Sequence, residues 1–510
     1  VMAGGNATFN PEPMADFIDF FVIGEGEDVV LEIVQAYREV RRADRETQLR
    51  RMAQIPGVYV PRFYAPRYYA EDGTLSGIEP LVDEAAPFIT KRIVPLLPPP
   101  VTRFILPHTD VVFNRASVEI QRGCTRGCRF CHAGMVFRPV RERSLAELLE
   151  TIDAIVRETG HEEIGLLSLS SSDYTQIAPL VKAIAEKYDP RTLSISLPSL
   201  RIESFSAELA DMLAGGRKTG FTFAPEAATD RLREVINKPI PTQSLLETAE
   251  EVYRRGWQLI KLYFMIGQPT ETDEDVRAIA RLAKEVYRIG KKHHGRRAKV
   301  RIGVSTFVPK PHTPFQWASL CPLDEIARKQ LLLREELGGA RGILYNWNNP
   351  EESLLEAVLS RGDRRLGAVI RGAWERGAKF DAWGDQFRPQ AWWDAFAAEG
   401  LDPAWYAHRP RLADEVFPWD HIGAGVEKRW LLMDWYASQR GEVKVDCRNH
   451  CYHCGILTAF KGIRANTPPQ AWQCPPVRNP RWQQLAEAGE IIGLTPVVRE
   501  NMKRARVPEV

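Results

Sequence analysis

Short apolar runs alternate with longer amphipathic stretches between residues 114 and 318. A short apolar run predicts a buried strand, and apolar residues spaced three and four apart predict a helix with one buried face. Strands that alternate with helices are typical of a parallel sheet. The expected strands are residues 116–121, 164–169, 192–197, 219–223, 258–265 and 301–307. The pattern therefore predicts an α/β core of six βα repeats, with polar or glycine-rich residues after each strand.

The regions on either side of this core have different patterns. Residues 1–45 contain short apolar runs with glycine turns and then a helical stretch, which predicts the end of an α/β unit. Residues 46–113 combine a charged helix with a Pro- and Tyr-rich connector, which we interpret as an ordered linker. Residues 319–440 are predicted to be mainly helical, and residues 441–510 form a Cys-rich tail that ends in a Pro-rich stretch.

Composition narrows the class of protein. A chain of 510 residues, 44% hydrophobic and 26% charged, is ordinary for a globular protein and long enough for about three domains. The net charge of +2 gives no global field for nucleic acid, and the basic segment 291–297 is favoured as a solvated helix end over an RNA contact. No apolar run reaches the ~18 residues of a membrane span, and no secretory signal is visible. We therefore expect a cytoplasmic protein that does not enter a membrane.

The cysteines carry the strongest chemical signal. Six of the eight lie in two triplets with the same C-x3-C-x2-C spacing, which favours metal ligation in a reducing cytosol over disulfides. The first triplet is Cys124, Cys128 and Cys131. Three thiolates on one loop can hold three irons of a cubane [4Fe–4S] cluster and leave the fourth iron open, whereas zinc sites usually pair two short hooks. The arginines of segment 138–143 either support an anionic cluster or carry surface charge.

This loop resembles the signature of the radical S-adenosylmethionine (radical SAM) superfamily. Residues 118–120 before it have the pattern of a short strand, and Phe130 is the aromatic residue that the superfamily usually carries before the third Cys. Segments 260–272 and 305–317 resemble the GxPxET and F-x-P-x-P-x-T-P runs of elongator-like and methylthiotransferase-like cores. Longer strings resemble an uncharacterised bacterial family of cobalamin-domain-linked radical SAM proteins.

The resemblance implies a fold and a chemistry. The fold would be a partial (β/α)6 TIM-like barrel, with its chemistry at the C-terminal ends of the strands. The catalytic cysteines would be those of the first triplet, whose [4Fe–4S] cluster binds S-adenosylmethionine (SAM) and cleaves it reductively to a 5′-deoxyadenosyl radical. A small electron donor such as flavodoxin or ferredoxin would supply the electron.

By the same resemblance, residues at successive strand ends are expected to contact SAM. They are Phe130, Ser171, Ser172, Asp173, Ser199, Arg201, Glu226, Lys261, Tyr263 and Pro309. Ser171–Asp173 stand where the superfamily commonly has Gly-Gly-Glu for the SAM amino group, so this sequence departs from the pattern, and a helix cap is the alternative. Ser199 and Arg201 are expected at the SAM carboxylate, with a salt bridge as the alternative for Arg201.

The later strands supply the remaining candidates. Glu226 follows the fourth strand, where related cores use a Glu to orient SAM or its ribose, and a helix first-turn charge is the alternative. Lys261 and Tyr263 alternate onto one face, so they can reach SAM or substrate if that face lines the barrel. Pro309 lies in an extended run that packs against the adenine in related cores. His312 in the same run is favoured as a structural residue over a catalytic acid.

The N-terminal residues suggest a domain that is only partly present. The chain begins with Val1 rather than Met, inside what resembles a strand end and a glycine turn, so we expect an N-terminally truncated protein. Residues 1–45 resemble the last part of a cobalamin-binding Rossmann-like domain. The D-x-H-x-x-G motif that ligates cobalt in that family is absent from this sequence. Cobalamin is therefore a candidate cofactor only of the full-length protein.

The second triplet is Cys447, Cys451 and Cys454, outside the barrel pattern. The candidate fourth ligands are Cys474, His450 and His453. A second [4Fe–4S] cluster and a structural zinc ion are both compatible with this spacing, because spacing alone does not choose the metal.

The leading hypothesis is a radical SAM enzyme whose substrate and reaction are unassigned, with methyl or methylthio transfer and an RNA substrate as options. The alternative is an iron–sulfur or zinc binding module that does not turn over SAM and acts in electron transfer or RNA-associated assembly. SAM turnover that depends on the first triplet separates the two.

Overall fold

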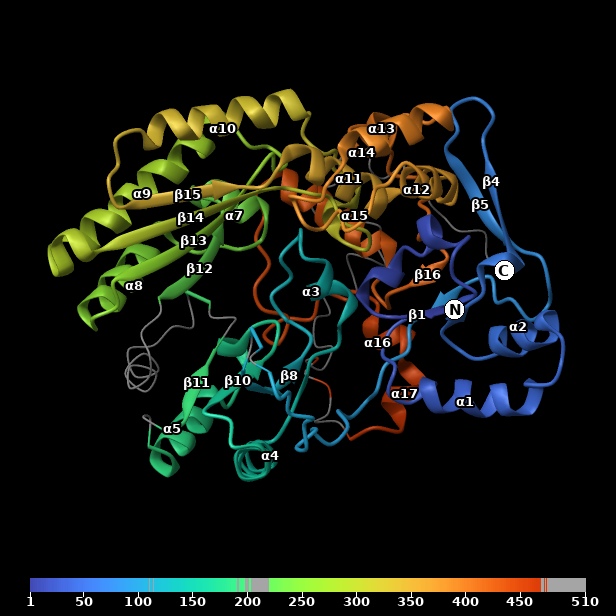
Figure 1. The fold of residues 1–510 in the computed structure, drawn as a ribbon, viewed down its shortest axis with the longest axis horizontal. Helices are drawn as coiled ribbons and strands as arrows, with labels where there is room; N and C mark the ends of the chain where they lie inside the picture. The colour runs from blue at the N-terminus through green and yellow to red at the C-terminus, as the bar shows by residue number, and fades with distance from the viewer. Residues whose placement is uncertain are drawn as a thin grey trace.

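The computed structural model describes residues 1–109, 111–112, 114–189, 192–197, 201–202, 220–468, 472 and 474. Two parallel sheets and their helices occupy the left half of Figure 1. The N-terminal region and a group of C-terminal helices occupy the right half. The first cysteine loop and its short helix α3 (His132–Val136) lie between these halves.

The first sheet contains three parallel strands in the order β11-β10-β7. The strands are β7 (Ala116–Glu119), β10 (Glu163–Leu167) and β11 (Ser194–Ser196). Two amphipathic helices, α4 (Leu145–Thr159) and α5 (Ile177–Lys187), share a hydrophobic core with these strands.

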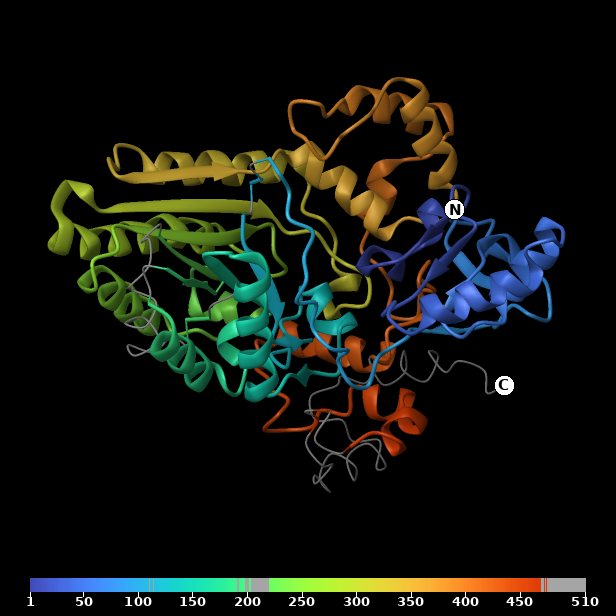
Figure 2. The ribbon, with the colours of Figure 1, turned by 60° about the horizontal axis from the view of Figure 1, so that its bottom comes forward.

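The second sheet contains four parallel strands in chain order. They are β12 (Phe221–Glu226), β13 (Leu259–Ile266), β14 (Lys299–Thr306) and β15 (Ile343–Trp347). One face is covered by α8 (Thr242–Arg254), α9 (Asp273–His294) and α10 (Leu323–Leu337) (Figures 1 and 2). The two sheets together contain all six predicted strands, so the predicted α/β class with the strands of a partial (β/α)6 barrel is confirmed.

The residue pattern explains these elements. Every second residue of β13 is buried against the helices: Ile260, Leu262, Phe264 and Ile266. The long helix α9 begins at a capping box formed by Thr272 and Asp275, and its basic last turn complements the helix dipole. The sequence did not predict β15, because this edge strand has three consecutive exposed residues, 344–346, and therefore no alternation.

A smaller unit lies at the N-terminus. Its sheet contains β1 (Met2–Ala3), β2 (Phe20–Val22) and β3 (Val58–Tyr59), and its helices are α1 (Val29–Val40) and α2 (Arg45–Ala53). A hairpin of β4 (Tyr64–Tyr68) and β5 (Leu75–Pro80) follows, and β6 (Ile89–Thr90) pairs with β16 (Ile422–Gly423). Regular elements thus occur in the predicted linker 46–113 as far as Thr90, and the predicted domain boundaries stay predictions.

The C-terminal region is mainly helical, as its pattern indicated. Its helices are α11 (Pro350–Arg361), α12 (Leu366–Glu375), α13 (Pro389–Ala398), α14 (Pro403–Ala407), α15 (Lys428–Gln439), α16 (Ile456–Ala459) and α17 (Lys461–Ala465). Helices α11 to α14 share one hydrophobic core. The segment between α11 and α12 contacts the N-terminal unit through an ion pair of Arg364 with Glu12 (3.0 Å).

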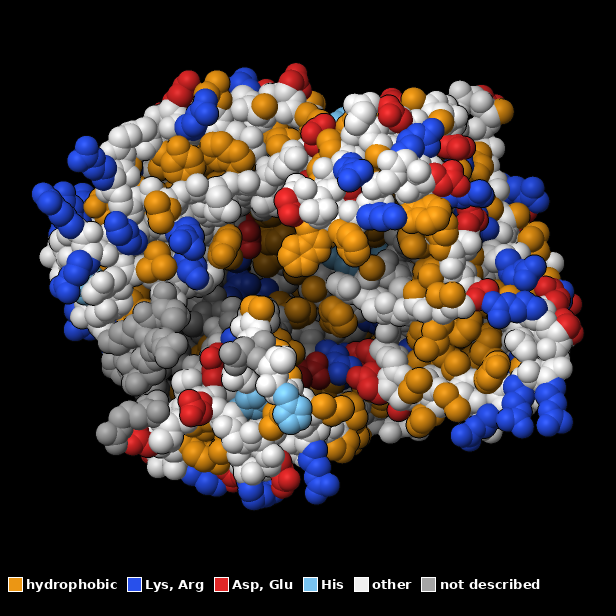
Figure 3. All heavy atoms as spheres, viewed as in Figure 1, with side chains coloured by type: hydrophobic (Ala, Val, Ile, Leu, Met, Phe, Trp, Pro, Cys, Tyr) orange, Lys and Arg blue, Asp and Glu red, His pale blue; other side chains and the backbone are white. Residues whose placement is uncertain are grey.

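The surface is hollowed near the centre of Figure 3, between the part that carries the second sheet and the part that carries α4 and α5. Hydrophobic and basic side chains are visible inside this hollow. None of the described helices has both the length and the apolar character needed to cross a lipid bilayer.

Candidate active site

The first cysteine triplet lies on the loop between β8 (Gln121–Arg122) and α3. After α3 the chain turns back toward this loop, and β9 (Arg141–Glu142) pairs with β8. Gly123 has a φ of 89°, and a Cβ at this position would lie 2.7 Å from the carbonyl oxygen of Phe137. Only glycine permits this approach, so the loop is held tightly against the segment that follows it.

The three thiols of this loop are set at different depths. Cys128 is buried, and Cys124 and Cys131 are partly exposed. The backbone N–H of Gly134 donates to the Sγ atom of Cys131 (3.3 Å). Burial raises the pKa of the Cys131 thiol to about 12, because it disfavours the charged thiolate. In the described part of the chain, no three His, Cys, Asp or Glu side chains converge as around a single metal ion. Three thiols on one loop are the donor set that an iron–sulfur cluster with one open iron uses.

Arg129, inside the cysteine motif, holds the loop against two distant segments. Its side chain is fully buried, and its Nε donates to the Asp434 carboxylate (2.9 Å) on α15. Its Nη1 donates to the carbonyl oxygens of Glu234 (3.0 Å) and Val235 (2.8 Å), at the end of α7 (Asp230–Val235). A cation at a helix C-terminus is favourable, so Arg129 both caps α7 and fixes the loop.

Asn237 makes a second set of contacts to the same loop. Its Nδ2 donates to the carbonyl oxygens of Arg126 (3.2 Å) and Gly127 (3.1 Å). Its Oδ1 accepts from the backbone N–H of Lys444 (2.7 Å). Its φ of 53° is a conformation that Asn tolerates better than most residues. Sequence reasoning missed both Arg129 and Asn237, because their partners are far away in the chain, although an Arg inside the cysteine motif was a visible signal.

The predicted Ser171–Asp173 segment is a 3-10 helix directly beside the loop. The Asp173 carboxylate accepts two hydrogen bonds from Arg126, one of them 2.9 Å long, and a third from Ser170 (2.6 Å). Burial alone would raise the pKa of Asp173, but the bonds from Arg126 outweigh it and hold the pKa below its usual range. Ser171 is fully buried, and its hydroxyl donates to the carbonyl oxygen of Leu166 (3.0 Å). Asp173 therefore supports the cysteine loop through Arg126, whereas Ser171 is bound to β10.

Arg201 also reaches the loop. Its Nη1 lies 3.9 Å from the Sγ of Cys128, and its Nε lies 4.0 Å from the Asp173 carboxylate. Its backbone N–H donates to the Ser172 hydroxyl (2.9 Å). The structure thus brings Ser172, Asp173 and Arg201 together at the cysteines. The fourth residue predicted from these strand ends, Ser199, lies outside the described residues.

Glu226 lies at the C-terminal end of β12, after an irregularity in the pairing with β13. Its φ is 66°, an uncommon conformation for Glu that is often found at functional sites. Its carboxylate pairs with Lys238 (3.2 Å), whose charge in turn acts on the Cys131 thiol. Glu226 and Lys238 therefore form a polar edge near the first triplet, and sequence reasoning had not singled out Lys238.

Three of the remaining candidates, Phe130, Pro309 and His312, lie near the exit of β14. Phe130 packs against a hydrophobic cluster that includes Phe307 and lies at the exit of β14. Pro309 is buried in the run that follows. His312 is buried, its Nε2 bonds to the carbonyl oxygen of Phe9 (2.9 Å), and burial lowers its pKa to about 4. This geometry supports a structural role for His312.

Lys261 and Tyr263 lie elsewhere, on the face of the second sheet that the helices leave uncovered. Together with Arg301 and Gly303 they line a separate, open cavity of about 360 Å³. Gly303 leaves room for the Tyr263 ring, which comes within 2.7 Å of the position that a Cβ would take. This cavity shares no lining residue with the cavity of the second triplet. No described contact joins Lys261 or Tyr263 to the first triplet, so their predicted contact with SAM stays a prediction.

The second triplet lines a cavity of about 260 Å³. Its thiols are those of Cys447, Cys451, Cys454 and Cys474. Of the three candidates for a fourth ligand, Cys474 and His453 line this cavity, whereas His450 does not belong to its lining. Two basic side chains, Arg138 and Lys444, also line it. The tertiary structure thus gathers four thiols and two cations around one space.

The chain matches known families over two stretches. Residues 118–283 match a family described as the radical SAM superfamily, and residues 1–61 match one described as the N-terminal part of radical SAM proteins. An uncharacterized protein of Methanocaldococcus jannaschii is 29% identical over 72% of each chain. The ribosomal protein uS12 methylthiotransferase RimO of Desulfotalea psychrophila is 27% identical over 36% of this chain and 42% of the relative.

A tRNA methylthiotransferase of Treponema pallidum, which acts on threonylcarbamoyladenosine, is 25% identical over 54% of this chain and 57% of the relative. The chain therefore spans only about half of the methylthiotransferase relatives. Among solved structures, the radical SAM methyltransferase TsrM of Kitasatospora setae, with cobalamin and a [4Fe–4S] cluster bound, matches with a TM-score of 0.42. Its identity is 17%, and the match covers 78% of this chain and 81% of that one.

The parallel sheets, the cysteine loop at their edge and the matched families define an enzyme with an iron–sulfur centre. The chain contains a radical SAM domain at residues 118–283. It is a radical SAM enzyme with an unassigned reaction, and its cofactors are the [4Fe–4S] cluster and SAM of that superfamily.

Proposed function

We propose that this chain binds its [4Fe–4S] cluster at Cys124, Cys128 and Cys131 and cleaves SAM reductively. The observation that carries the proposal is that Arg201 lies 3.9 Å from the Sγ of Cys128, while Glu226, at the end of β12, pairs with Lys238, whose charge acts on the Cys131 thiol. When bound, the cluster and SAM supply the chemistry: one electron cleaves the sulfonium into methionine and a 5′-deoxyadenosyl radical.

The protein's own side chains would bind SAM and orient it at the cysteine loop. Arg201, 3.9 Å from the Sγ of Cys128, offers a guanidinium that can pair with the SAM carboxylate. The Glu226 carboxylate and the Ser172 hydroxyl offer acceptors for the amino group or the ribose. Arg126 and Asp173 keep the loop in place through their ion pair. The aromatic cluster around Phe130 excludes water from one side of the loop.

Two relatives that are named methylthiotransferases favour transfer of a methyl or methylthio group to RNA or protein as the reaction class. The proposal includes a small electron donor such as flavodoxin or ferredoxin. All eight cysteines are free thiols, which supports a reducing cytoplasmic setting. Cobalamin remains a proposal for a longer form of the protein. The second triplet with Cys474 is proposed as a metal site for a cluster or zinc.

The second candidate function is a binding module without SAM turnover. It is favoured by the Ser171–Asp173 segment, which departs from Gly-Gly-Glu and whose Asp173 carboxylate is already engaged by Arg126. In that case the loop would hold a cluster, but its amino-group acceptors would be used internally.

The test is 5′-deoxyadenosine formation by the anaerobically reconstituted, dithionite-reduced protein. We expect product from the parent chain, background levels from the Cys124→Ala, Cys128→Ala, Cys131→Ala triple variant, and near-parent levels from Cys321→Ala, a cysteine outside both triplets. Absence of product from a parent protein whose first cluster is seen by EPR would reject the proposal in favour of the binding module.

A further inference from the structure

The two cysteine sites share a wall made of their own ligand loops. The backbone N–H of Cys447 donates to the carbonyl oxygen of Thr125, the residue after Cys124 (3.1 Å). The Thr125 hydroxyl donates to the Asp446 carboxylate (2.8 Å). Thr125 and Gly127, both from the first loop, line the cavity of the second site. Cys124 of the first site is therefore connected to Cys447 of the second site through one intervening residue, Thr125, and one hydrogen bond.

Buried contacts fix this arrangement. Asn237 joins the two loops, because it donates to the carbonyl oxygens of Arg126 and Gly127 and accepts from the N–H of Lys444. The fully buried Asp434 carboxylate accepts from Arg129 of the first loop (2.9 Å) and pairs with Lys444 of the second site (3.0 Å). These buried contacts tie the two ligand loops to each other, so the fold sets the distance between the two sites.

Arg138 stands between the two sites. Its side chain is 6% exposed, its Nε donates to the Gly134 carbonyl oxygen (3.1 Å), and its guanidinium lies 5.3 Å from the Trp430 ring centroid. One terminal nitrogen lies 3.5 Å from where a Cβ of Gly127 would be. The same guanidinium contacts the Cys454 thiol and lines the second cavity. One cation thus faces both ligand loops.

No carboxylate of the described residues forms an ion pair with Arg138. A buried cation without an anionic partner is costly, so this position needs negative charge from an occupant of the cavity. Four thiolates around an iron–sulfur core supply that charge. Tetrahedral zinc at Zn–S distances of 2.3 Å would draw its thiolates to about 3.8 Å from one another. The four thiols line a cavity of about 260 Å³, which is more room than a single zinc ion needs and suits a polynuclear core.

We propose that the second site holds a four-thiolate iron–sulfur cluster coupled electrostatically to the first, with Arg138 as the shared positioning residue. The inference rests on the proposed function only for the cluster at the first site. In a low-dielectric wall, an electron added to either cluster makes reduction of the other less favourable. The positive charge of Arg138 favours the reduced form of both.

The test uses the full chain, reconstituted anaerobically with iron and sulfide in the presence of zinc. We expect the parent chain to hold twice the iron of a Cys447→Ala, Cys451→Ala, Cys454→Ala variant and to show broadened or split EPR signals when fully reduced. The Cys124→Ala, Cys128→Ala, Cys131→Ala variant should show the second cluster alone, with unsplit lines and a higher midpoint potential than in the parent. Zinc bound at the second site, or two clusters whose signals are sums of the single-site spectra, would overturn the proposal.

Variants of Arg138 sharpen this test. Arg138→Gln should shift both midpoint potentials to lower values, whereas Arg138→Lys should retain most of the parent potentials because the charge remains. Arg143→Gln is the matched control: it removes a buried guanidinium of the same segment that does not line the second cavity. Equal shifts of the midpoint potentials in Arg138→Gln and Arg143→Gln would contradict the role of Arg138 as the positioning residue shared by the two clusters. Coupled clusters without 5′-deoxyadenosine formation would reject SAM cleavage and leave this inference standing.

Discussion

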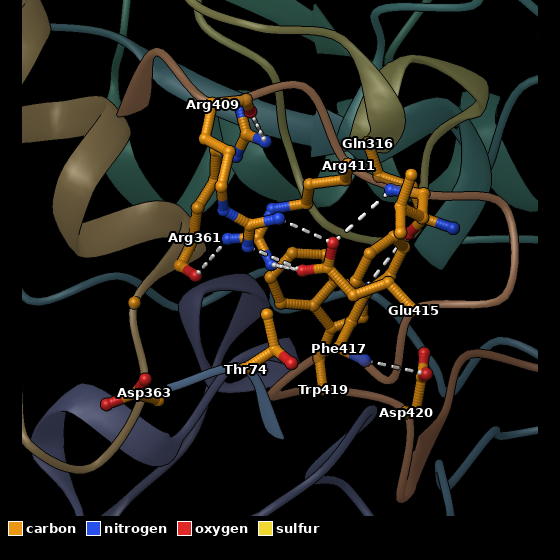
Figure 4. Close-up of polar contacts among 12 residues, drawn as sticks. Thr74, Gln316, Arg361, Asp363, Arg409, Arg411, Glu415, Phe417, Trp419 and Asp420 are labelled. Carbon is orange, nitrogen blue, oxygen red and sulfur yellow. Dashed lines mark hydrogen bonds and ion pairs between the residues drawn. The ribbon is translucent and has the colours of Figure 1, made fainter. Parts of the chain in front are cut away.

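Two regions of the molecule bury arginines, and they differ in what faces the charge. In the C-terminal region, Arg409 and Arg411 converge on the carboxylate of Glu415 (Figure 4). Arg409 donates two hydrogen bonds of 2.7 Å to it, and Arg411 donates one of 3.0 Å. Arg361 beside them is 1% exposed and donates to backbone carbonyl oxygens, among them that of Ala318 (2.6 Å).

At the cysteine sites, Arg138 opens on a cavity with four thiols. Burial lowers the pKa of Arg361 well below its usual range, and the nearby Arg411 and Arg409 lower it further. Burial also opposes the charge of Arg138, but the thiols of Cys454 and Cys447 outweigh it and hold its pKa above the usual range. A buried arginine without a carboxylate partner therefore indicates a ligand site only where it faces a cavity with donor groups, as Arg138 does. Arg361 faces only backbone carbonyl oxygens, so its role is structural.

The largest effect is expected from Asp434→Asn. This carboxylate is fully buried between Arg129 and Lys444, and removal of one partner from a buried ion pair costs about 3–5 kcal/mol. Both cations belong to the cysteine unit, so the EPR signals of both clusters should change as well. Anaerobic urea unfolding and EPR measure the two effects. EPR spectra like those of the parent in the folded variant would show that the two cluster sites do not depend on the Asp434 carboxylate, which would contradict this prediction.

Glu415→Gln should destabilise the protein by about 3 kcal/mol, because Arg409 and Arg411 lose their common anion. The iron content and EPR spectra of this variant should equal those of the parent, since the group of Arg409, Arg411 and Glu415 faces only protein. The same urea unfolding and iron assays apply. A change in cluster signals similar to that of Asp434→Asn would mean that the two regions are not independent, and the comparison would fail.

Asn237→Ala should cost about 1–3 kcal/mol, because two carbonyl oxygens and one N–H lose their partner. We also expect faster loss of iron in air, measured by absorbance, since the loops are less firmly joined. Asn237→Asp is the matched control that retains the acceptor for Lys444 but removes the donor to the first loop. Equal iron loss in parent and Asn237→Ala would contradict this role.

The smallest effect is a pH dependence. Burial would raise the pKa of Glu415, but the bonds and charges of Arg409 and Arg411 hold it below its usual value. A lowered folded-state pKa contributes stability that is fully present above the unfolded value of about 4.3 and is lost as the pH falls through the folded value. The unfolding free energies of parent and Glu415→Gln should therefore differ most near neutral pH and converge in acid. A difference that grows in acid would reverse the sign of this argument.

Local pattern was sufficient for much of the fold. The six barrel strands were predictable because each alternates or is continuously apolar, as in β13, where burial follows every second residue. The edge strand β15 was not predictable, because its consecutive exposed residues hide the period. At the site, the resemblance to radical SAM enzymes implied that Ser172, Asp173 and Arg201 contact SAM, and the structure brings these three residues to the first triplet. The same reasoning could not tell that Arg126 already occupies the Asp173 carboxylate.

By itself, the sequence determined the two cysteine triplets, the positions of the six strands along the chain and the chemistry that thiolates at this spacing can support, since all of these depend on neighbouring residues. Only the tertiary structure decided that the two triplets lie against one wall, that Cys474 and His453, but not His450, line the cavity of the second, and that Arg138 faces both. Thr125 and Asp446, whose hydrogen bond is part of that wall, are 321 positions apart. A contact over such a separation depends on the packing of α7, α15 and the loop around the buried Arg129, and no local pattern contains it.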